Sequence, residues 1–446
     1  MTTSSRQALG QSVGFAAFIW GYPLVETVRT CRLQAVDATG VWQSPIDRLH
    51  HARQVATAAD RDVVTPANDL LYTTGWIHLA DGPRLLRVPS RRGHGGRYFV
   101  LALYDAWTNN FANPGWRNSP QDGETVVLVG PDTPADAPLP AGARVVRSPT
   151  SLVWLIGRVL AGDADDLPGA QALQSDITLQ CPQGTDGGRL PAGVQHWAGP
   201  PEDTMAALRD RPQDAAGIAS AFFTNLCRAQ SDQAVPASDS GMAAWFGRAG
   251  LLPAATFAWE QLAEDLRTGL TQGLVDAAAM IEEASRSRRA RPWAVHYGIG
   301  RYGTEYLVRA LTAYKGLGAL ATDEAVYAMC DFDAERVPLD GRQRYVLRFP
   351  PGELPPVDAF WSVTMYDADR FLYANPLQRH AIGDRTPGLR RAADGSLVLE
   401  ISHTPPADTA NWLPAPAGPC YLILRMYGPR PEARSWVIPP LQRLAA

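Results

Sequence analysis

Phe-Trp-Ser-Val-Thr-Met-Tyr-Asp, residues 360–367, is the stretch of sequence that decides the fold. Alternate residues of a strand point to opposite faces, so Trp361 and Met365 would share one face and Thr364 and Tyr366 the other. Further alternating runs stand at 345–349, 397–403 and 420–427, separated by Pro-Pro, Asp-Gly and Pro-Ala-Gly turns. The sequence therefore predicts an antiparallel β-sandwich of jelly-roll type in the C-terminal part of the chain.

Short β-like runs also occur in the N-terminal half, and every segment between them contains glycine or proline. They cover residues 84–88, 97–104, 124–129 and 144–147. A polar stretch from 163 to 214 is predicted to be a surface connection, and the Ala- and Leu-rich residues 216–329 are predicted to be helical. The predicted fold class is α+β, mainly β, with two antiparallel β-sandwich or jelly-roll modules and a helical middle segment. The predicted units are an N-terminal helical segment (1–59), a first module (60–215), the helical segment (216–330) and a second module (331–446).

Several motifs are too long and unusual to arise from composition alone. They are Asn68-Asp69-Leu70-Leu71-Tyr72, Tyr104-Asp105-Ala106-Trp107-Thr108-Asn109, residues 360–367, Ile382-Gly383-Asp384-Arg385 and Asn411-Trp412-Leu413-Pro414. With these motifs the chain resembles the bacterial DUF1254/DUF1214 domain family over residues 12–440. The resemblance implies the two-module architecture, and it implies no particular reaction, because the family name records an unknown function.

Charge and composition limit the classes of partner. The chain has 446 residues, of which 46% are hydrophobic and 19% charged, and its formal net charge is -4. Without a basic excess, neither nucleic acid nor an anionic membrane surface is expected as a partner. A small-molecule substrate is the predicted partner. The two modules could pair within one chain or across a homo-oligomer, and the sequence leaves that choice open.

The N-terminus and the cysteines predict a cytoplasmic protein. The apolar run 13–24 is too short for a membrane span, contains Gly21 and Pro23, and lacks a signal-peptide cleavage site after it. The five cysteines are odd in number, far apart and never arranged as C-x-x-C, which is typical of reduced thiols.

The common catalytic motifs are missing or out of context. There is no P-loop and no H-E-x-x-H, and the G-x-S-x-G at 10–14 has no strand before it. The G-x-G-x-x-G at 298–303 lacks the alternating strands and helices of a dinucleotide-binding domain, so we interpret it as a bend that lets backbones approach closely. The sequence therefore predicts no metal and no cofactor. A cupin-like metal site built from His380, His403 and Asp384 is the alternative.

Lys315 is the single lysine of the chain; the other basic residues among the 41 Lys and Arg are arginines. A buried amine can act as a base or as a Schiff-base nucleophile. The alternative is a lysine at a helix end, beside Gly316, that faces the negative end of the helix dipole.

Polar residues at the ends of apolar strands supply the candidate site. Two strands end in Tyr-Asp, and we expect carboxylates and phenols to line a cleft between the modules, with arginines as anion anchors and tryptophans as walls. The catalytic candidates are Asp69, Tyr72, Asp105, Tyr366 and Asp367, and the substrate-binding candidates are Asn68, Trp76, Trp107, Asn109, Arg301, Trp361, Trp412 and Arg425. In the alternative interpretation, Asn and Asp at strand ends make only local turn hydrogen bonds, and the tryptophans fill cores.

The predicted function is a cofactor-independent enzyme for acid-base chemistry of the lyase, isomerase or hydrolase type. Its substrate would be a small oxygenated metabolite in the cleft, with aspartate as base and tyrosine as acid or oxyanion donor. The alternative function is binding of a saccharide-like or lipid-like ligand without turnover.

Overall fold

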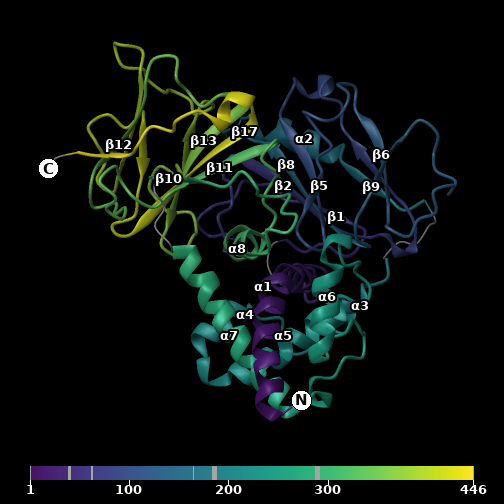
Figure 1. Ribbon diagram of the computed structural model, residues 1–446. Coiled ribbons are helices and arrows are strands. Elements are labelled where there is room, and N and C mark those ends of the chain that lie inside the picture. Colours follow the sequence, from purple (N-terminus) through teal and green to yellow (C-terminus); the bar gives the residue numbers. More distant parts are fainter. Residues whose placement is uncertain are drawn as a thin grey trace.

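A computed structural model describes residues 2–38, 42–61, 64–163, 165–182, 188–286 and 292–444. The α-helices are α1 (Thr3–Ala35), α2 (Leu167–Ser175), α3 (Ala192–Gln195), α4 (Thr204–Asp210), α5 (Ala215–Ala229), α6 (Ser240–Phe246), α7 (Glu264–Arg286) and α8 (Tyr306–Gly316). Most of them gather in a helical unit below two β modules, and α8 lies at the junction of the three parts (Figure 1). The fold class is thus α+β, mainly β, with a helical middle segment, as the sequence predicted.

Each β module consists of a five-stranded sheet and a four-stranded sheet. The strands of the first module are β1 (Leu49–His51), β2 (Leu70–His78), β3 (Arg84–Val88), β4 (Phe99–Asp105), β5 (Asn110–Ala112), β6 (Glu124–Val129), β7 (Arg144–Arg147), β8 (Leu152–Leu160) and β9 (Thr178–Gln180). Those of the second are β10 (Trp293–Val295), β11 (Ala325–Cys330), β12 (Tyr345–Phe349), β13 (Val357–Asp367), β14 (Ala381–Gly383), β15 (Leu397–Ser402), β16 (Trp412–Pro414), β17 (Cys420–Pro429) and β18 (Gln442–Arg443). Two strands of the second module, β10 and β11, come from the range predicted as helical.

The two modules have the same topology, strand for strand. The five-stranded sheets run β1-β2-β8-β4-β5 and β10-β11-β17-β13-β14, and the four-stranded sheets run β7-β6-β3-β9 and β16-β15-β12-β18. Each strand of the first module therefore corresponds to the strand nine places later. Even the departure from antiparallel pairing is repeated, because β7 pairs in parallel with β6 and β16 pairs in parallel with β15. The two β modules thus form an internal structural repeat, which was not predicted from the sequence.

Strands β8 and β17 occupy the centre of the two five-stranded sheets, and both faces of each are covered. In β8, Val153 and Leu155 point into the sandwich of the first module, whereas Trp154 and Ile156 join the core shared with the helices. A strand buried on both faces loses the alternation of polar and apolar residues. Strand β8, a continuous run of nine buried residues, was missing from the predicted strands, although β4 and β17, which are also buried on both faces, were predicted.

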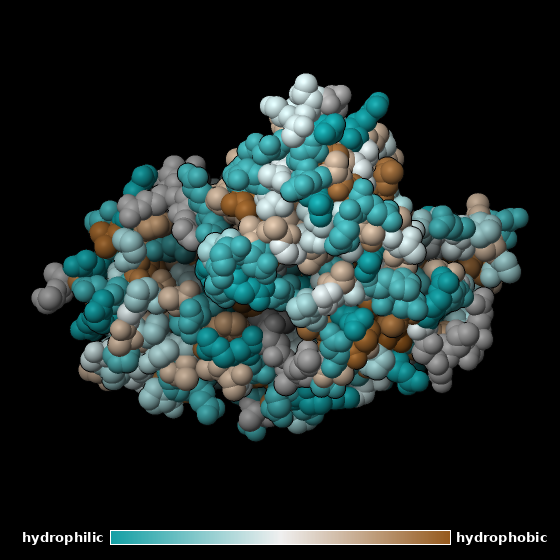
Figure 2. Space-filling view, turned by 90° about the horizontal axis from the view of Figure 1, so that it is seen from below, coloured by the Kyte–Doolittle hydropathy of each residue, from teal (hydrophilic) through white to brown (hydrophobic). Residues whose placement is uncertain are grey.

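The helical unit is built around α1, which is longer than the predicted apolar run and contains Pro23. By length and composition α1 could cross a membrane, but 67% of its most apolar window is buried inside the structure. Its glycines allow close contact with α7, because a Cβ on Gly14 would lie 2.5 Å from the carbonyl oxygen of Leu270. The glycines of the G-x-S-x-G motif at 10–14 thus serve helix packing. From below, Figure 2 shows mostly hydrophilic residues, with hydrophobic residues in separate small groups.

Replacement of Gly273 by alanine should destabilise the α1–α7 contact. A Cβ there would lie 2.2 Å from the carbonyl oxygen of Gln11, which is backbone and must shift. We expect a loss of about 1–3 kcal/mol in the free energy of unfolding, measured by urea denaturation. The matched control is Gly241→Ala in α6, where a Cβ meets nothing within 4 Å. It should be neutral or slightly stabilising, since alanine favours helix over glycine by about 1 kcal/mol. Equal effects of both substitutions would contradict this account.

Candidate functional site

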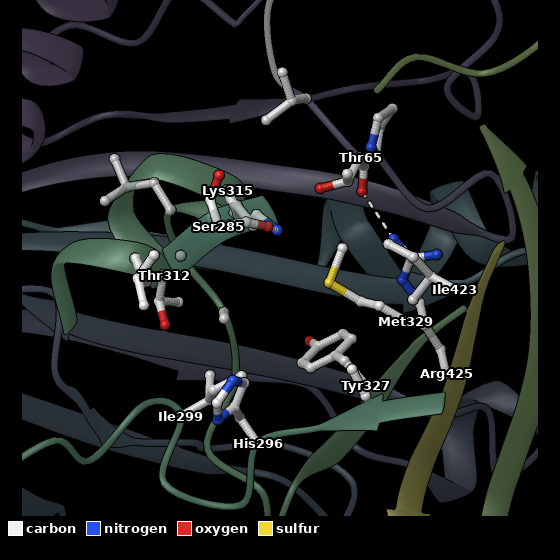
Figure 3. Close-up of a pocket in the computed structure, with 18 of the residues that line it drawn as sticks. Thr65, Ser285, His296, Ile299, Thr312, Lys315, Tyr327, Met329, Ile423 and Arg425 are labelled. Carbon is white, nitrogen blue, oxygen red and sulfur yellow. Dashed lines mark hydrogen bonds between the residues drawn. The ribbon is translucent and has the colours of Figure 1, made fainter. Parts of the chain in front are cut away.

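A cavity of about 190 Å³ lies where the two five-stranded sheets and α8 meet. Its walls come from both modules and from the helical unit. The residues that line it include Trp42, Thr65, Tyr72, Trp154, Ile156, Arg158, Ser285, His296, Ile299, Thr312, Lys315, Gly318, Tyr327, Met329, Asp331, Ile423, Arg425 and Tyr427. In Figure 3 Lys315, Ser285 and Thr312 lie on the helical side, opposite Tyr327, Ile423 and Arg425 on the strands. Most of the wall is apolar or aromatic, as in small-molecule sites generally.

Two buried arginines, Arg158 of β8 and Arg425 of β17, occupy equivalent positions in the two modules. Arg158 pairs in register with Tyr72 of β2, and Arg425 pairs in the same way with Tyr327 of β11. They are 7% and 4% exposed. Among the described residues, neither guanidinium forms an ion pair with a carboxylate. Two permanent positive charges therefore lie in one largely apolar cavity.

Each of these arginines reaches across to a backbone carbonyl of the opposite half. Arg158 donates to the carbonyl oxygen of Gly318, just before β11, at 2.7 Å. Arg425 donates to that of Thr65, just before β2, at 2.8 Å (Figure 3). Hydrogen bonds from a charged group stabilise by about 1.5–3 kcal/mol. The contacts are reciprocal, so they fix the loop before β2 and the loop before β11 in equivalent positions around the cavity.

Tyrosines surround both guanidinium groups. The ring of Tyr72 lies 5.9 Å from the Arg158 guanidinium carbon, and the ring of Tyr366 lies 5.6 Å from that of Arg425. Burial raises the pKa of Tyr366 to about 12, and burial also raises the pKa of Tyr327. These phenols stay protonated at neutral pH. They therefore do not neutralise the arginines, and the hydroxyl of Tyr327, which lines the cavity, can donate a hydrogen bond to an anion.

Two buried acids lie behind the cavity, again at equivalent positions. The backbone carbonyl of Asp69 accepts from Ala161, and that of Glu324 accepts from Gly428. Burial raises the pKa of Asp69, which the nearby Ser362 hydroxyl and Arg425 partly offset. Burial also raises the pKa of Glu324, to about 7. The Glu324 carboxylate accepts from the Tyr98 hydroxyl at 2.7 Å, whereas no hydrogen bond within the described residues satisfies the Asp69 carboxylate.

Lys315 lies on the helical wall at the end of α8. Its ammonium group donates to the carbonyl oxygen of Ser285 at the end of α7. The alternative interpretation, a lysine in the last turn of a helix beside Gly316, describes its position in the chain correctly. The structure adds that this helix end faces the cavity.

Of the residues predicted for the site, Tyr72 and Arg425 line the cavity. Tyr366 and Asp69 lie just outside it. The Tyr366 hydroxyl donates to the carbonyl oxygen of Pro66 at 2.7 Å, and Asp69 lies close enough to Arg425 to feel its charge. Asn68 supports the same loop, because its side chain donates to the carbonyl oxygen of Ala56.

Asp105 and Asp367, two of the predicted catalytic residues, lie outside the cavity lining. Asp105 accepts from the backbone N–H groups of Trp107 and Asn109, and Asp367 accepts in the same way from Asp369 and Phe371. Asp105 also accepts from the side chain of Asn109, and burial raises its pKa to about 6. The two Tyr-Asp motifs are thus two copies of one turn. Their aspartates make the local hydrogen bonds that the alternative interpretation described.

The remaining substrate-binding candidates also lie away from the cavity lining. Trp361 and Trp412 are buried in the second module, and the Trp412 indole donates to the carbonyl oxygen of Ser402. Trp107 packs on Trp20 in the core shared with the helices, at 4.3 Å between ring centroids. Trp76 stacks on Trp154 at 4.8 Å and thus supports a lining residue from behind.

Arg301 is exposed and forms an ion pair with Asp323 at 3.1 Å, outside the cavity. It is therefore not an anion anchor for this site. The glycine-rich segment around it does make the predicted bend: Gly300 has a φ of 83°, and a Cβ there would lie 2.6 Å from the nitrogen of Ala321.

The described residues contain no group of three His, Cys, Asp or Glu side chains that could hold a metal ion. The members of the alternative metal site each have a local partner. His380 and His403 bond the carbonyl oxygens of Tyr373 and Ala415, and Asp384 accepts from the backbone of Trp361.

Sequence reasoning missed Arg158, although one signal could have found it. Residues 154–158 read Trp-Leu-Ile-Gly-Arg, and residues 421–425 read Tyr-Leu-Ile-Leu-Arg. In both segments the arginine interrupts a buried apolar strand. Comparing the two halves of the chain would have pointed from Arg425, which was singled out, to Arg158, and from Ile423 to Ile156.

Comparison with known proteins supports the architecture. The description "Protein of unknown function (DUF1254)" matches residues 46–181, and "Protein of unknown function (DUF1214)" matches residues 324–431. No curated protein matches the chain. The crystal structure of the VPA0106 protein from Vibrio parahaemolyticus is similar over 98% of this chain and 100% of that one, with 23% identity and a TM-score of 0.70. An uncharacterised protein from Burkholderia cenocepacia covers 99% of this chain and 95% of its own, with 11% identity and a TM-score of 0.45. At these identities, the likeness to VPA0106 shows the fold alone.

Glu324 should make stability depend on pH. Its folded pKa of about 7 lies above the ordinary 4.5, so the folded state binds a proton more tightly than the unfolded state, and stability falls as the pH rises from about 4.5 to 7. Glu324→Gln removes this dependence. We expect the variant to gain on the order of 2 kcal/mol over the wild type at pH 8, and the gain to shrink towards pH 5. Urea denaturation across this pH range measures it, with the exposed Glu353→Gln as control. Parallel stability curves for Glu324→Gln and the wild type would contradict the assignment.

Proposed function

We propose that this chain, which belongs to the DUF1254/DUF1214 family, binds a small organic anion in the cavity between its two β modules. The observation that carries the proposal is the pair of buried guanidinium groups, Arg158 and Arg425, which line the cavity without a carboxylate partner among the described residues. Buried charges are normally paired, and a bound carboxylate or phosphate supplies the missing partner.

The rest of the wall supports an organic rather than an inorganic anion. Ile156, Met329 and Ile423 present apolar surface, and Trp42 and Trp154 add aromatic surface. Such surface is favourable only for a ligand that has an apolar body to bury. The phenols of Tyr72 and Tyr327 can donate hydrogen bonds to its oxygens.

Acid-base catalysis on the bound anion, the function predicted from the sequence, is the second candidate, and Lys315 is the observation that favours it. The aspartates predicted as bases lie outside the cavity, whereas the Lys315 amine lines it. In a partly buried site, a lysine can lose its proton and serve as a general base. Tyrosine at the opposite wall would act as the proton donor.

Binding is tested by calorimetry with a panel of organic acids and, in parallel, uncharged analogues of the same size. We expect acids alone to bind, and Arg158→Gln and Arg425→Gln each to weaken binding about 10- to 100-fold, because each loses charge-assisted hydrogen bonds. The matched control is Arg301→Gln, which removes an exposed arginine outside the cavity and should bind as the wild type does.

Because Arg425 also holds the loop at Thr65, its variants must be checked by circular dichroism, and Arg425→Lys serves as the conservative variant that keeps the charge. Equal binding of acids and uncharged analogues, or wild-type affinity in the folded arginine variants, would refute the proposal.

Catalysis is tested by deuterium exchange of a bound 2-oxo acid in D2O, followed by proton NMR. If Lys315 removes a proton next to the carbonyl group, the wild type accelerates exchange over buffer, and Lys315→Gln loses about 10²-fold of that acceleration while it still binds the acid. No acceleration by the wild type, or undiminished acceleration by the variant, would count against catalysis by Lys315 and leave anion binding unaffected.

A further inference from the structure

The two arginines of the cavity are alike in their hydrogen bonding as well as in their position. A guanidinium has five N–H donors. Arg158 uses its donors on the carbonyl oxygens of Gly318 and Ile156 and on the hydroxyl of Tyr104. Arg425 donates to the carbonyl oxygen of Thr65 and to the hydroxyl of Thr364. Every one of these partners is neutral, so both groups keep a full charge and spare donors for a ligand.

Among the described residues that line the cavity, basic side chains outnumber acidic ones. The charged members of this lining are Arg158, Arg425, Lys315 and Asp331. The two buried acids at equivalent places, Asp69 and Glu324, lie behind the wall. Burial raises the pKa of both acids, and within the described part of the chain neither carboxylate forms an ion pair or hydrogen bond with Arg158 or Arg425.

The apolar and phenolic groups near the arginines are also duplicated. Tyr72 and Ile156 line the cavity beside Arg158, and their equivalents Tyr327 and Ile423 line it beside Arg425. A ligand group that suits one arginine therefore meets nearly the same surroundings at the other.

We infer that the ligand is an organic dianion of the dicarboxylate class, with one carboxylate on Arg158, the other on Arg425, and an apolar body between Ile156 and Ile423. This inference rests on the proposed anion-binding function. A monoanion would leave one buried guanidinium without an ion-pair partner, and a neutral ligand would leave both, which costs free energy in a site of low polarity. The alternative is a single compact anion, such as inorganic phosphate, held by both arginines at once.

Calorimetry at fixed pH and ionic strength with the full-length protein tests the inference. The probes are the linear dicarboxylates from malonate to suberate, the monocarboxylates of the same lengths, and inorganic phosphate. We expect one dicarboxylate length to bind best, and at least about 10-fold more tightly than its monocarboxylate, because the second charged contact adds about 1.5–3 kcal/mol.

The variants assign each carboxylate to its arginine. Arg158→Gln and Arg425→Gln should each bind that dicarboxylate no more tightly than the wild type binds the monocarboxylate, and Arg301→Gln should keep the wild-type preference. If either arginine variant fails to fold, its Lys variant keeps the charge and should retain part of the preference.

Three other results of the calorimetry would overturn different claims. Equal affinities for dicarboxylates and monocarboxylates would overturn the dianion inference and leave the proposed anion binding in place. Tighter binding of phosphate than of every organic acid would overturn the inference in favour of a single anion between the arginines. No binding of any acid would overturn the proposed function together with it.

Discussion

The hydrogen bonds of two buried arginines across the junction of the modules are the constraint on which the rest of the structure depends. A guanidinium that leaves water must find acceptors, and Arg158 and Arg425 each find one in the loop of the opposite half. Those carbonyl oxygens are available only when the two five-stranded sheets face each other across the loops before β2 and β11. The same contacts that fix the modules therefore also shape the cavity and place two positive charges in its wall.

The helical unit forms the side of the cavity that the two five-stranded sheets do not form. Helix α8 brings Lys315 and Thr312 to the cavity, and α7 brings Ser285 to the same side (Figure 3). The close glycine contacts between α1 and α7 hold α7 in place. Because side chains at the cavity thus come from three parts of the chain, a shift of any one part would change the site, and the site need not be close in sequence to any motif.

The internal repeat explains several features that look unrelated along the sequence. The two Tyr-Asp strand ends are equivalent turns, with Thr108 and Arg370 both at positive φ, 69° and 72°. Asp69 and Glu324 are equivalent buried acids, and the segments that contain Arg158 and Arg425 are equivalent central strands. The halves differ in detail at these places, for instance Trp154 against Tyr421. The two modules share one architecture although individual contacts differ, as expected when packing constrains polarity and volume more than identity.

The sequence by itself determined the two-module architecture, the helical segment between the modules and many of the strands, the buried β4 and β17 among them, because strand-forming runs and turn residues are local signals. It also singled out Tyr72 and Arg425, since polar groups in apolar strands are unusual wherever they occur. It did not lead to β8 and its Arg158, which lie in a continuous run of nine buried residues. Nor could it separate Asp105, which bonds its own turn, from the residues that line the cavity. Only the tertiary structure decided which side chains meet, because the pairing of Arg158 with Gly318 and of Arg425 with Thr65 joins residues that are far apart in the chain and close only after folding.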